Sequence, residues 1–283
     1  MDELMEINFG DEMAILATQS LLYEAVTWPK PGLVTPVSSG KHSDMNIYHF
    51  MNSSVSLYPY FKRLTLLAQE PYSLKEIFES SRELGKNAEE RMYLETEGVN
   101  THKGAIFILG ILVMAFSYTR SRGLDFSTLS ESVKEMTKGI VKGDFLGIKQ
   151  ATTHGERLFI EEKIEGIRGE AEKGFPIIFQ LGLPYFESLE GNLEKKILQT
   201  LIFVIQYLED TTILHKEPIK ILIELQTLAK ECIEMGGIFT EEGIYKYQKL
   251  EEFCLKRRVS PGGAADCIAG ILFLSRARER FFR

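Results

Sequence analysis

Apolar residues recur along most of this chain at the three- and four-residue spacing of an amphipathic helix. The segments with that spacing cover residues 11–28, 46–69, 73–94, 105–122, 128–141, 192–208, 218–235, 241–256 and 260–274. Few segments alternate with period two and are rich in β-branched residues, so no sheet is expected. The pattern predicts an all-α protein of roughly ten or more helices, arranged as a single domain over residues 1–283.

Several residues mark where the predicted helices begin, break or become buried. Pro59 should kink or break the helix over 46–69. Two segments, Ser73–Glu76 and Thr128–Glu131, have the spacing of a capping box at a helix start. The apolar run Ala105–Tyr118 is too short to span a bilayer, so it predicts a buried core helix.

The composition excludes some classes of protein. The chain has 33 Lys and Arg against 40 Asp and Glu, a net charge of −7, so it has no general basic field for nucleic acid or an anionic membrane. Any phosphate must be bound locally. Cys232, Cys254 and Cys267 form no C-x-x-C pair, which argues against disulfides and thiolate zinc sites. The acidic start, Met1–Glu6, is unlike a secretion signal, so a cytoplasmic protein is expected.

A polar turn precedes the predicted core helix and offers varied chemistry. It runs from Thr96 to Gly104 and contains Asn100, Thr101, His102 and Lys103. An amide, a hydroxyl, an imidazole and an ammonium are thus placed at the mouth of a rigid helix, as binding and catalytic groups often are.

A second polar turn begins the last predicted helix. Ser260 has the position of an N-cap and Pro261 that of the first helical residue, and the amides of Gly262 and Gly263 are unshielded by side chains. Bare amides at a helix N-terminus bind anions. Asp266 follows within about one turn and either faces the same mouth or is simply solvated.

Two further segments contain histidine beside an acidic residue. Residues 38–44 fail the Walker pattern, which leaves His42 and Asp44 as a ligand, a base or residues without a role. His154 and Glu156 have the H-x-E spacing of zinc deaminases, but the P-C-x-x-C that those enzymes require is absent.

Two more turns carry charged residues. Arg168 stands between glycines and is suited either to phosphate or to a surface pair with Glu170. Asp210 follows a long apolar helix, with His215 five residues later. A carboxylate at a helix C-terminus is opposed by the helix dipole, so a metal or a cation is expected beside Asp210.

Six of these segments, in order, resemble the triphosphoribosyl-dephospho-CoA synthase family. They are Pro29–Val34, Gly98–Phe107, Thr153–Glu156, Gly166–Ala171, Asp210–His215 and Ser260–Asp266. The resemblance implies an all-helical transferase that moves the 5-triphosphoribosyl group of ATP to the ribose 2′-hydroxyl of 3′-dephospho-CoA and releases adenine. The chain departs from the family pattern at Thr35, Thr212 and Lys216.

The implied reaction breaks an N-glycosidic bond, which requires carboxylates near the sugar, a donor to adenine and a base for the hydroxyl. The residues that we expect at the site are, for phosphate or nucleotide, Lys30, His42, Asn100, Thr101, Lys103, Arg168, His215, Ser260, Gly262 and Gly263; for Mg²⁺ or oxocarbenium stabilisation, Asp44, Asp210 and Asp266; as base, Glu156 or Glu170; and as donor or ligand, His102 or His154.

The resemblance also implies partners. ATP with Mg²⁺ and 3′-dephospho-CoA are the expected substrates, and the product is a precursor for the acyl carrier protein of citrate lyase or malonate decarboxylase. A homodimer is an alternative to a monomer. Two competing functions remain open: a helical nucleotide hydrolase in which water replaces the acceptor, and a non-catalytic protein that binds a nucleotide or an acyl carrier protein.

Overall fold

The computed structural model describes residues 8–145, 157–160 and 164–282. These residues form helices joined by turns, and the one β-type pairing among them is an isolated bridge between Thr35 and Ser38. The prediction of an all-α fold is therefore confirmed, whereas the single-domain organisation of residues 1–283 stays a prediction.

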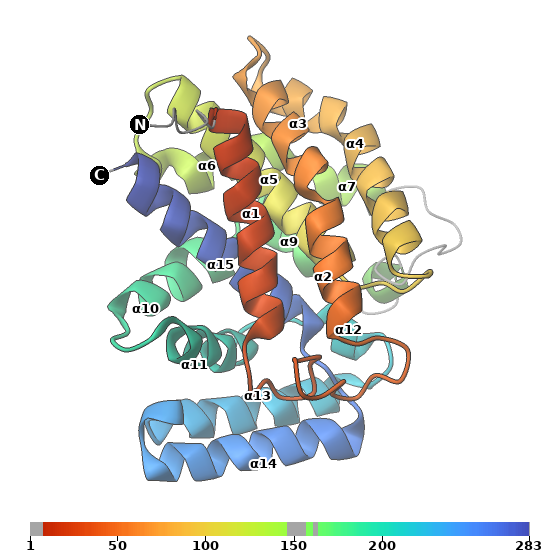
Figure 1. The fold of residues 1–283 in the computed structure, drawn as a ribbon, viewed down its shortest axis with the longest axis vertical. Helices are drawn as coiled ribbons and strands as arrows, with labels where there is room; N and C mark the ends of the chain where they lie inside the picture. The colour runs from red at the N-terminus through yellow and green to blue at the C-terminus, as the bar shows by residue number, and fades with distance from the viewer. Residues whose placement is uncertain (1–7, 146–156, 161–163, 283) are drawn as a thin grey trace, which may run out of the picture.

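The α-helices are arranged as shown in Figure 1. They are α1 (Phe9–Val26), α2 (Ile47–Ser56), α3 (Tyr58–Gln69), α4 (Leu74–Glu95), α5 (Lys103–Ser121), α6 (Leu129–Thr137), α7 (Ile140–Phe145), α9 (Gly166–Glu172), α10 (Leu183–Ser188), α11 (Leu193–Ile205), α12 (Thr211–Leu214), α13 (Ile219–Glu234), α14 (Glu241–Arg257) and α15 (Gly262–Phe281). Residues 157–160 are also helical, and single turns of other helix types cover Phe126–Thr128, Ile177–Gly182 and Gly237–Phe239.

The predicted helix boundaries are partly confirmed. Ser73 and Glu76 form the expected capping box of α4, and Pro59 lies in the first turn of α3, where it separates α3 from α2. The capping box at Thr128 is wrong, because Asp125 caps a short 3₁₀ turn there and Thr128 makes no side-chain cap. The Asp125 side chain accepts from the Ser127 N–H at 2.8 Å and so takes the capping role that we expected of Thr128.

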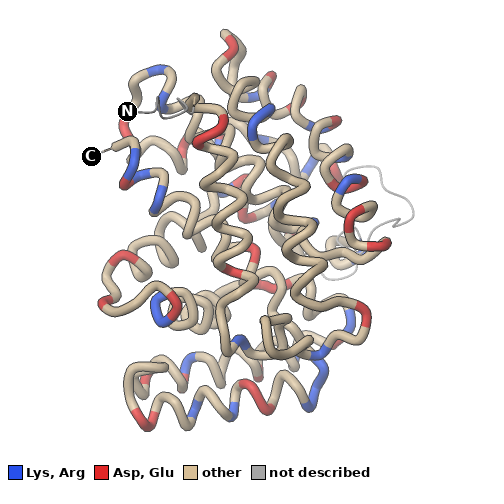
Figure 2. Tube along the Cα trace, viewed as in Figure 1, with Lys and Arg blue, Asp and Glu red and all other residues tan. Residues whose placement is uncertain are grey.

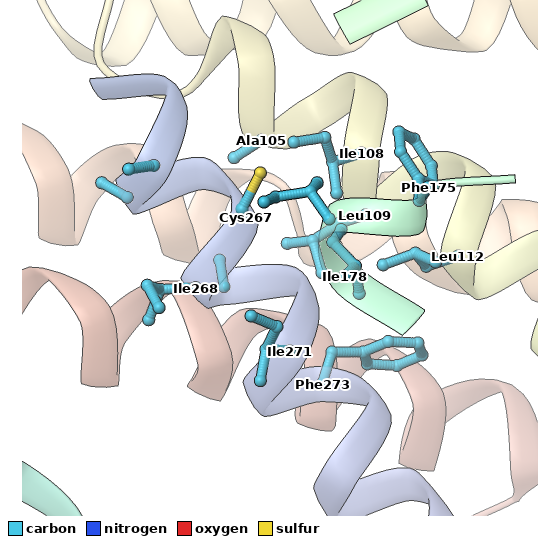
Figure 3. Close-up of a cluster of buried hydrophobic side chains, with 14 of the residues drawn as sticks. Ala105, Ile108, Leu109, Leu112, Phe175, Ile178, Cys267, Ile268, Ile271 and Phe273 are labelled. Carbon is cyan, nitrogen blue, oxygen red and sulfur yellow. The ribbon is translucent and has the colours of Figure 1, made fainter. Parts of the chain in front are cut away.

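Helix α5 is the central element of the fold and packs against α15. Figure 3 shows Cys267 of α15 beside Ala105 and Leu109 of α5. Gly270 lets the two helices approach closely, because a Cβ there would lie 2.9 Å from Leu112 Cδ1. All three cysteines are free and buried.

Helix α5 is also, within the described part of the chain, the one helix long and apolar enough to cross a membrane. Its most apolar stretch is 72% buried inside the protein, which is the environment of a core helix. The prediction of a buried helix is confirmed. The helix extends beyond the apolar run at both ends, where it includes Lys103 and Arg120.

The beginning of α1 and the end of α15 lie side by side at one end of the molecule. The rings of Phe9 and Phe281 meet edge to face with centroids 5.2 Å apart. The first turn of α15 therefore lies at the other end, near α12 and above the α13–α14 hairpin at the bottom of Figure 1. Most polar motifs of the sequence converge there.

Candidate active site

The first turns of α5 and α15 meet at Asp266. Its Oδ2 occupies the space beside the Gly104 Cα, where an added Cβ would lie only 2.0 Å from that oxygen. The carboxylate also accepts a hydrogen bond from the N–H of Ala105. Asp266 is thus held at the positive end of α5, and only glycine at position 104 leaves room for it.

Burial and neighbouring charges make Asp266 an unusual carboxyl group. Desolvation raises its pKa well above the ordinary value, and the charges of Asp210 and Glu24 raise it further. The side chain nevertheless stays partly exposed. A carboxyl group that is desolvated by its surroundings and still reachable has the properties of a catalytic acid or base.

Asp210 corrects two of our predictions. It does not end the preceding helix, because α11 stops at Ile205 and Asp210 is the N-cap of α12. Its Oδ1 accepts from the Thr212 N–H at 2.9 Å, and its Oδ2 accepts from the Ala264 N–H of α15 at 3.1 Å. Two helix N-termini therefore compensate its charge, where we expected a metal or a cation.

The glycine amides that start α15 are likewise occupied by the protein itself. The Gly262 N–H donates to Thr212 Oγ1 at 3.1 Å, and the Gly263 N–H donates to Asp210. Ser260 is not the N-cap, because the helix begins one residue later than predicted with Pro261 at the cap position. In the described structure these two amides are therefore engaged by Thr212 and Asp210, and their role toward a ligand phosphate stays a prediction.

Lys30 is an internal counterion and not a surface ligand for phosphate. Its side chain is 2% exposed, and Nζ donates to Glu24 Oε1 at 2.5 Å and to the Glu24 carbonyl at 2.7 Å. Desolvation lowers the pKa of Lys30, opposed by the charge of Glu24. A phosphate could reach this ammonium only by breaking the buried pair, so our assignment of Lys30 to phosphate is wrong for this structure.

His102 lies at the N-cap position of α5 and is 3% exposed. Its Nδ1 is 2.8 Å from Ser53 Oγ, and the Phe50 ring contacts its edge with centroids 5.0 Å apart. Desolvation, and secondarily the charge of Lys30, lowers the pKa of His102 to about 3, so the imidazole is neutral near pH 7. Its Nε2 and the Thr101 hydroxyl are buried without a hydrogen-bond partner in the described structure.

Asn100 and Lys103 form the outer edge of this turn. Asn100 Oδ1 accepts from the Lys103 N–H at 3.1 Å and so caps the turn. The Lys103 ammonium is 47% exposed and lies 2.8 Å from Glu89 Oε2 of α4. This surface ion pair is weak enough to exchange for a ligand phosphate.

Two lysines, Lys41 and Lys216, join the predicted residues His42 and His215 in a basic cluster near Asp210, and the sequence prediction did not include either lysine. The charges of Lys216 and Asp210 act on the pKa of Lys41, and the charges of Lys41 and Lys216 act on the pKa of His42. His215 is coupled to Lys216, Arg157 and Lys41. Desolvation, then the neighbouring cations, lowers the pKa of both histidines. Figure 2 shows basic residues gathering at the lower right, around the α14–α15 connection and the loop after α1.

Close packing brings that loop to α15. A Cβ on Gly32 would lie 2.2 Å from the Val259 carbonyl oxygen, and the Lys41 N–H donates to the Gly32 carbonyl at 3.3 Å. Thr35 closes a tight turn with Ser38. In the sequence, Gly40 directly before Lys41 was the one indication that this lysine could bind phosphate. We did not use it, because residues 38–44 fail the Walker pattern.

The remaining predicted residues are divided between this region and others. Asp44 is 64% exposed and 3.8 Å from His42 Nδ1. Glu170 lies near Cys267 and Glu209, and desolvation raises its pKa. Arg168 instead pairs with Asp144 at 2.8 Å, which Arg82 of α4 also contacts. His154 and Glu156 lie outside the described residues.

The predicted metal ligands do not form a preassembled site. Within residues 8–145, 157–160 and 164–282, no three His, Cys, Asp or Glu side chains group as they would around a metal ion. Asp210 already uses both oxygens in hydrogen bonds, and Asp44 is exposed in the loop after α1. A metal brought by a phosphate ligand would need only one or two protein carboxylates.

A depression of about 760 Å³ lies farther along α15, and its lining includes Leu272, Arg276 and Arg280. These residues follow Asp266 by 6 to 14 positions, or roughly 9–21 Å along the helix. The depression contains none of the predicted site residues. We therefore place the candidate active site at Asp266, where the perturbed carboxyl group and the buried imidazole lie.

Comparisons with known proteins agree with one another. Residues 10–281 match the CitG family, described as ATP:dephospho-CoA triphosphoribosyl transferase. The chain is 38% identical to the protein CitXG of Leuconostoc mesenteroides subsp. cremoris, over 92% of this chain and 58% of that protein. It thus spans somewhat more than half of the length of CitXG.

Two shorter relatives are covered over most of their length. The probable 2-(5''-triphosphoribosyl)-3'-dephosphocoenzyme-A synthase of Malonomonas rubra is 37% identical over 91% of this chain and 85% of that protein. The protein of the same name from Lactiplantibacillus plantarum is 36% identical over 91% and 94%, respectively. No solved structure matches the chain.

Proposed function

The chain belongs to the ATP:dephospho-CoA triphosphoribosyl transferase family, and we propose that its reaction takes place where the first turns of α5 and α15 meet. The enzyme is a pentosyltransferase that moves the 5-triphosphoribosyl group of ATP to the 2′-hydroxyl of 3′-dephospho-CoA and releases adenine. The assignment of residues below is our proposal.

The reaction defines what the site must supply. The bond between C1′ of ATP and N9 of adenine breaks, and its electron pair leaves with the base. A bond forms between C1′ and the 2′-oxygen of dephospho-CoA, whose proton is lost while adenine gains one. Positive charge therefore builds on the ribose and negative charge on adenine, and a base must stand beside the hydroxyl.

Asp266 is our candidate for that base, and its position carries the proposal. It is partly exposed, it lies at the meeting point of the two helices, and burial raises its pKa, which makes it a better proton acceptor than an ordinary carboxylate. The nearby charges of Asp210 and Glu24 would favour a cationic ribose. Glu170 is close enough to Cys267 to add to this negative field.

The basic cluster suits the triphosphate of ATP. Lys41 and Lys216 offer ammonium groups, and His42 and His215 offer ring nitrogens. Repulsion between the Lys41 and Lys216 ammonium groups would be relieved by a polyanion. Lys103, at the other side of Asp266, is suited to the diphosphate of dephospho-CoA.

Magnesium fits this arrangement as a companion of the triphosphate. Asp44 is the exposed carboxylate beside the cluster and would hold the ion, whereas the oxygens of Asp210 are engaged. Bound there, Mg²⁺ would neutralise phosphate charge and orient the chain of phosphates. The product would pass on towards an acyl carrier protein of citrate lyase or malonate decarboxylase.

Incubation with ATP, Mg²⁺ and dephospho-CoA, followed by mass spectrometry, tests the proposal. We expect free adenine and a triphosphoribosylated dephospho-CoA in equal amounts. Adenine with free triphosphoribose would indicate a hydrolase, and no adenine at all would indicate a binding protein. Asp266→Asn should lower kcat by at least about 100-fold. Lys41→Ala should mainly raise the KM for ATP, so equal effects on both constants would contradict the division of roles.

A further inference from the structure

The hydroxyl group of Ser53 has an unusual partner. Ser53 lies in α2 and is fully buried. Several serines and threonines in the described helices donate to the carbonyl one turn back, as Ser54 does to Phe50 at 2.7 Å. Ser53 instead contacts His102 Nδ1 at 2.8 Å, across 49 positions of sequence. In the described structure its Oγ has no other hydrogen-bond partner.

This geometry decides which nitrogen of His102 carries the proton. A buried hydroxyl proton needs an acceptor, and Nδ1 is the one that Ser53 can reach. The neutral imidazole must then accept at Nδ1 and carry its hydrogen on Nε2. Lys30 lies close by and opposes a second proton on the ring. Phe50, on the same helix as Ser53, packs against the ring and restricts its rotation.

The Nε2 atom has no partner among the described residues although it is buried. An unpaired N–H in such a place costs free energy, which a ligand acceptor would recover. We propose that Ser53 is a positioning residue that holds His102 as a neutral Nε2–H donor for the adenine leaving group. His102 is then neither the base nor a metal ligand. A neutral imidazole can serve as donor where developing negative charge must be stabilised.

This inference rests on the proposed function for the identity of the acceptor, whereas the tautomer does not depend on turnover. Adenine offers N3 and N7 as acceptors while the C1′–N9 bond breaks. The donor forms a hydrogen bond and keeps its proton, so the proton that adenine gains still comes from solvent in exchange for the one that Asp266 takes up.

The tautomer can be read directly by nitrogen NMR of the full chain labelled with ¹⁵N-histidine. The chain has five histidines, and the His102 signals are those lost in His102→Gln. We expect an unprotonated Nδ1 and a protonated Nε2 between pH 5 and 8. The opposite tautomer, or a mixture of both in the wild-type protein, would overturn the inference without any reference to activity.

A double-mutant cycle tests the positioning role. Ser53→Ala should lower kcat about 10-fold and leave the KM for ATP unchanged. His102→Gln supplies an amide donor that has no tautomer, so adding Ser53→Ala to it should change kcat less than 2-fold. The matched control is Ser54→Ala, a buried neighbour whose hydroxyl turns to its own helix, and it should keep wild-type kcat. Additive losses in the cycle would refute a role through His102.

Analogues of ATP test the acceptor. If the Nε2–H donates to adenine, either 3-deaza-ATP or 7-deaza-ATP should show a penalty in kcat with the wild-type enzyme that is about 10-fold larger than with His102→Ala. Equal penalties in both enzymes for both analogues would exclude adenine as the acceptor. Absence of adenine release from the wild type with ATP would remove the proposed function itself, and the NMR measurement would still decide the tautomer.

Discussion

The contact between Gly104 and Asp266 allows a single methyl group to test the active site. In Gly104→Ala the new Cβ would be 2.0 Å from Asp266 Oδ2, whereas ordinary contacts begin at 3.4 Å. The carboxylate must therefore move by about 1.4 Å. It cannot keep its place over the first turn of α5.

The expected effects on stability and on rate are very different. Alanine is favoured over glycine in a helix by about 1 kcal/mol, and the hydrogen bond from Ala105 that Asp266 loses is worth about as much. The free energy of unfolding should therefore change by less than about 1 kcal/mol. Misplacing a catalytic group by 1 Å or more costs roughly 100-fold in rate, or about 2.7 kcal/mol of transition-state stabilisation.

Adenine release in saturating ATP and dephospho-CoA measures this loss, and urea unfolding followed by circular dichroism measures stability. The matched control is Gly143→Ala in α7, because a Cβ there would meet nothing within 4 Å. Gly143→Ala should keep wild-type kcat. If Gly104→Ala also keeps wild-type kcat while folded, Asp266 has no catalytic role and the proposed site is wrong.

Three further predictions concern buried charge. Lys30→Met leaves Glu24 buried without its counterion and should lower the free energy of unfolding in urea by about 3–5 kcal/mol. The control Lys86→Ala breaks an exposed ion pair and should lower it by less than about 1 kcal/mol. Equal losses in the two variants would show that Lys30 is not buried as described. Asp210→Ala removes the caps of two helices and should destabilise the protein by about 2–4 kcal/mol, so a loss below about 1 kcal/mol would contradict the double cap. The folded-state pKa of His102 is depressed to about 3, so below pH 6.5 the unfolded chain binds a proton on this imidazole that the folded chain does not bind. The free energy of unfolding should therefore fall as the pH drops from about 6.5 towards 3, by at most about 1.4 kcal/mol per pH unit. His102→Gln should flatten this part of the stability profile, and an unchanged slope would place the imidazole in water.

The sequence predicted the helices well because their signals are local. The capping box at Ser73 lies within four residues, and the apolar run that forms most of α5 by itself predicts a buried helix. The candidate site residues Asp266, His102 and Lys103 were likewise proposed from turns at helix starts, and the structure places all three in or next to the first turn of a helix. Their own neighbours along the chain were sufficient to place them at a helix mouth.

The errors concern partners that are distant in sequence. The amide of Gly263 was expected to face a ligand anion, but nothing nearby in the sequence reveals that Asp210, more than fifty residues earlier, accepts from it. Lys30 has the same appearance in sequence whether it faces phosphate or is buried against Glu24. The charge of Lys216 acts on Lys41 because the fold brings together two loops that are far apart in the sequence.

The adjacency of Phe9 and Phe281 has a consequence for how such a chain can be joined to others. The ring of Phe281 lies fifteen positions after Asp266 on one continuous helix, which is roughly 22 Å along its axis. A domain fused at either end of the described chain would therefore attach to the same pole, away from the proposed active site at Asp266. CitXG of Leuconostoc mesenteroides is considerably longer than this chain, and a domain attached at this pole of the present fold would leave the proposed active site uncovered.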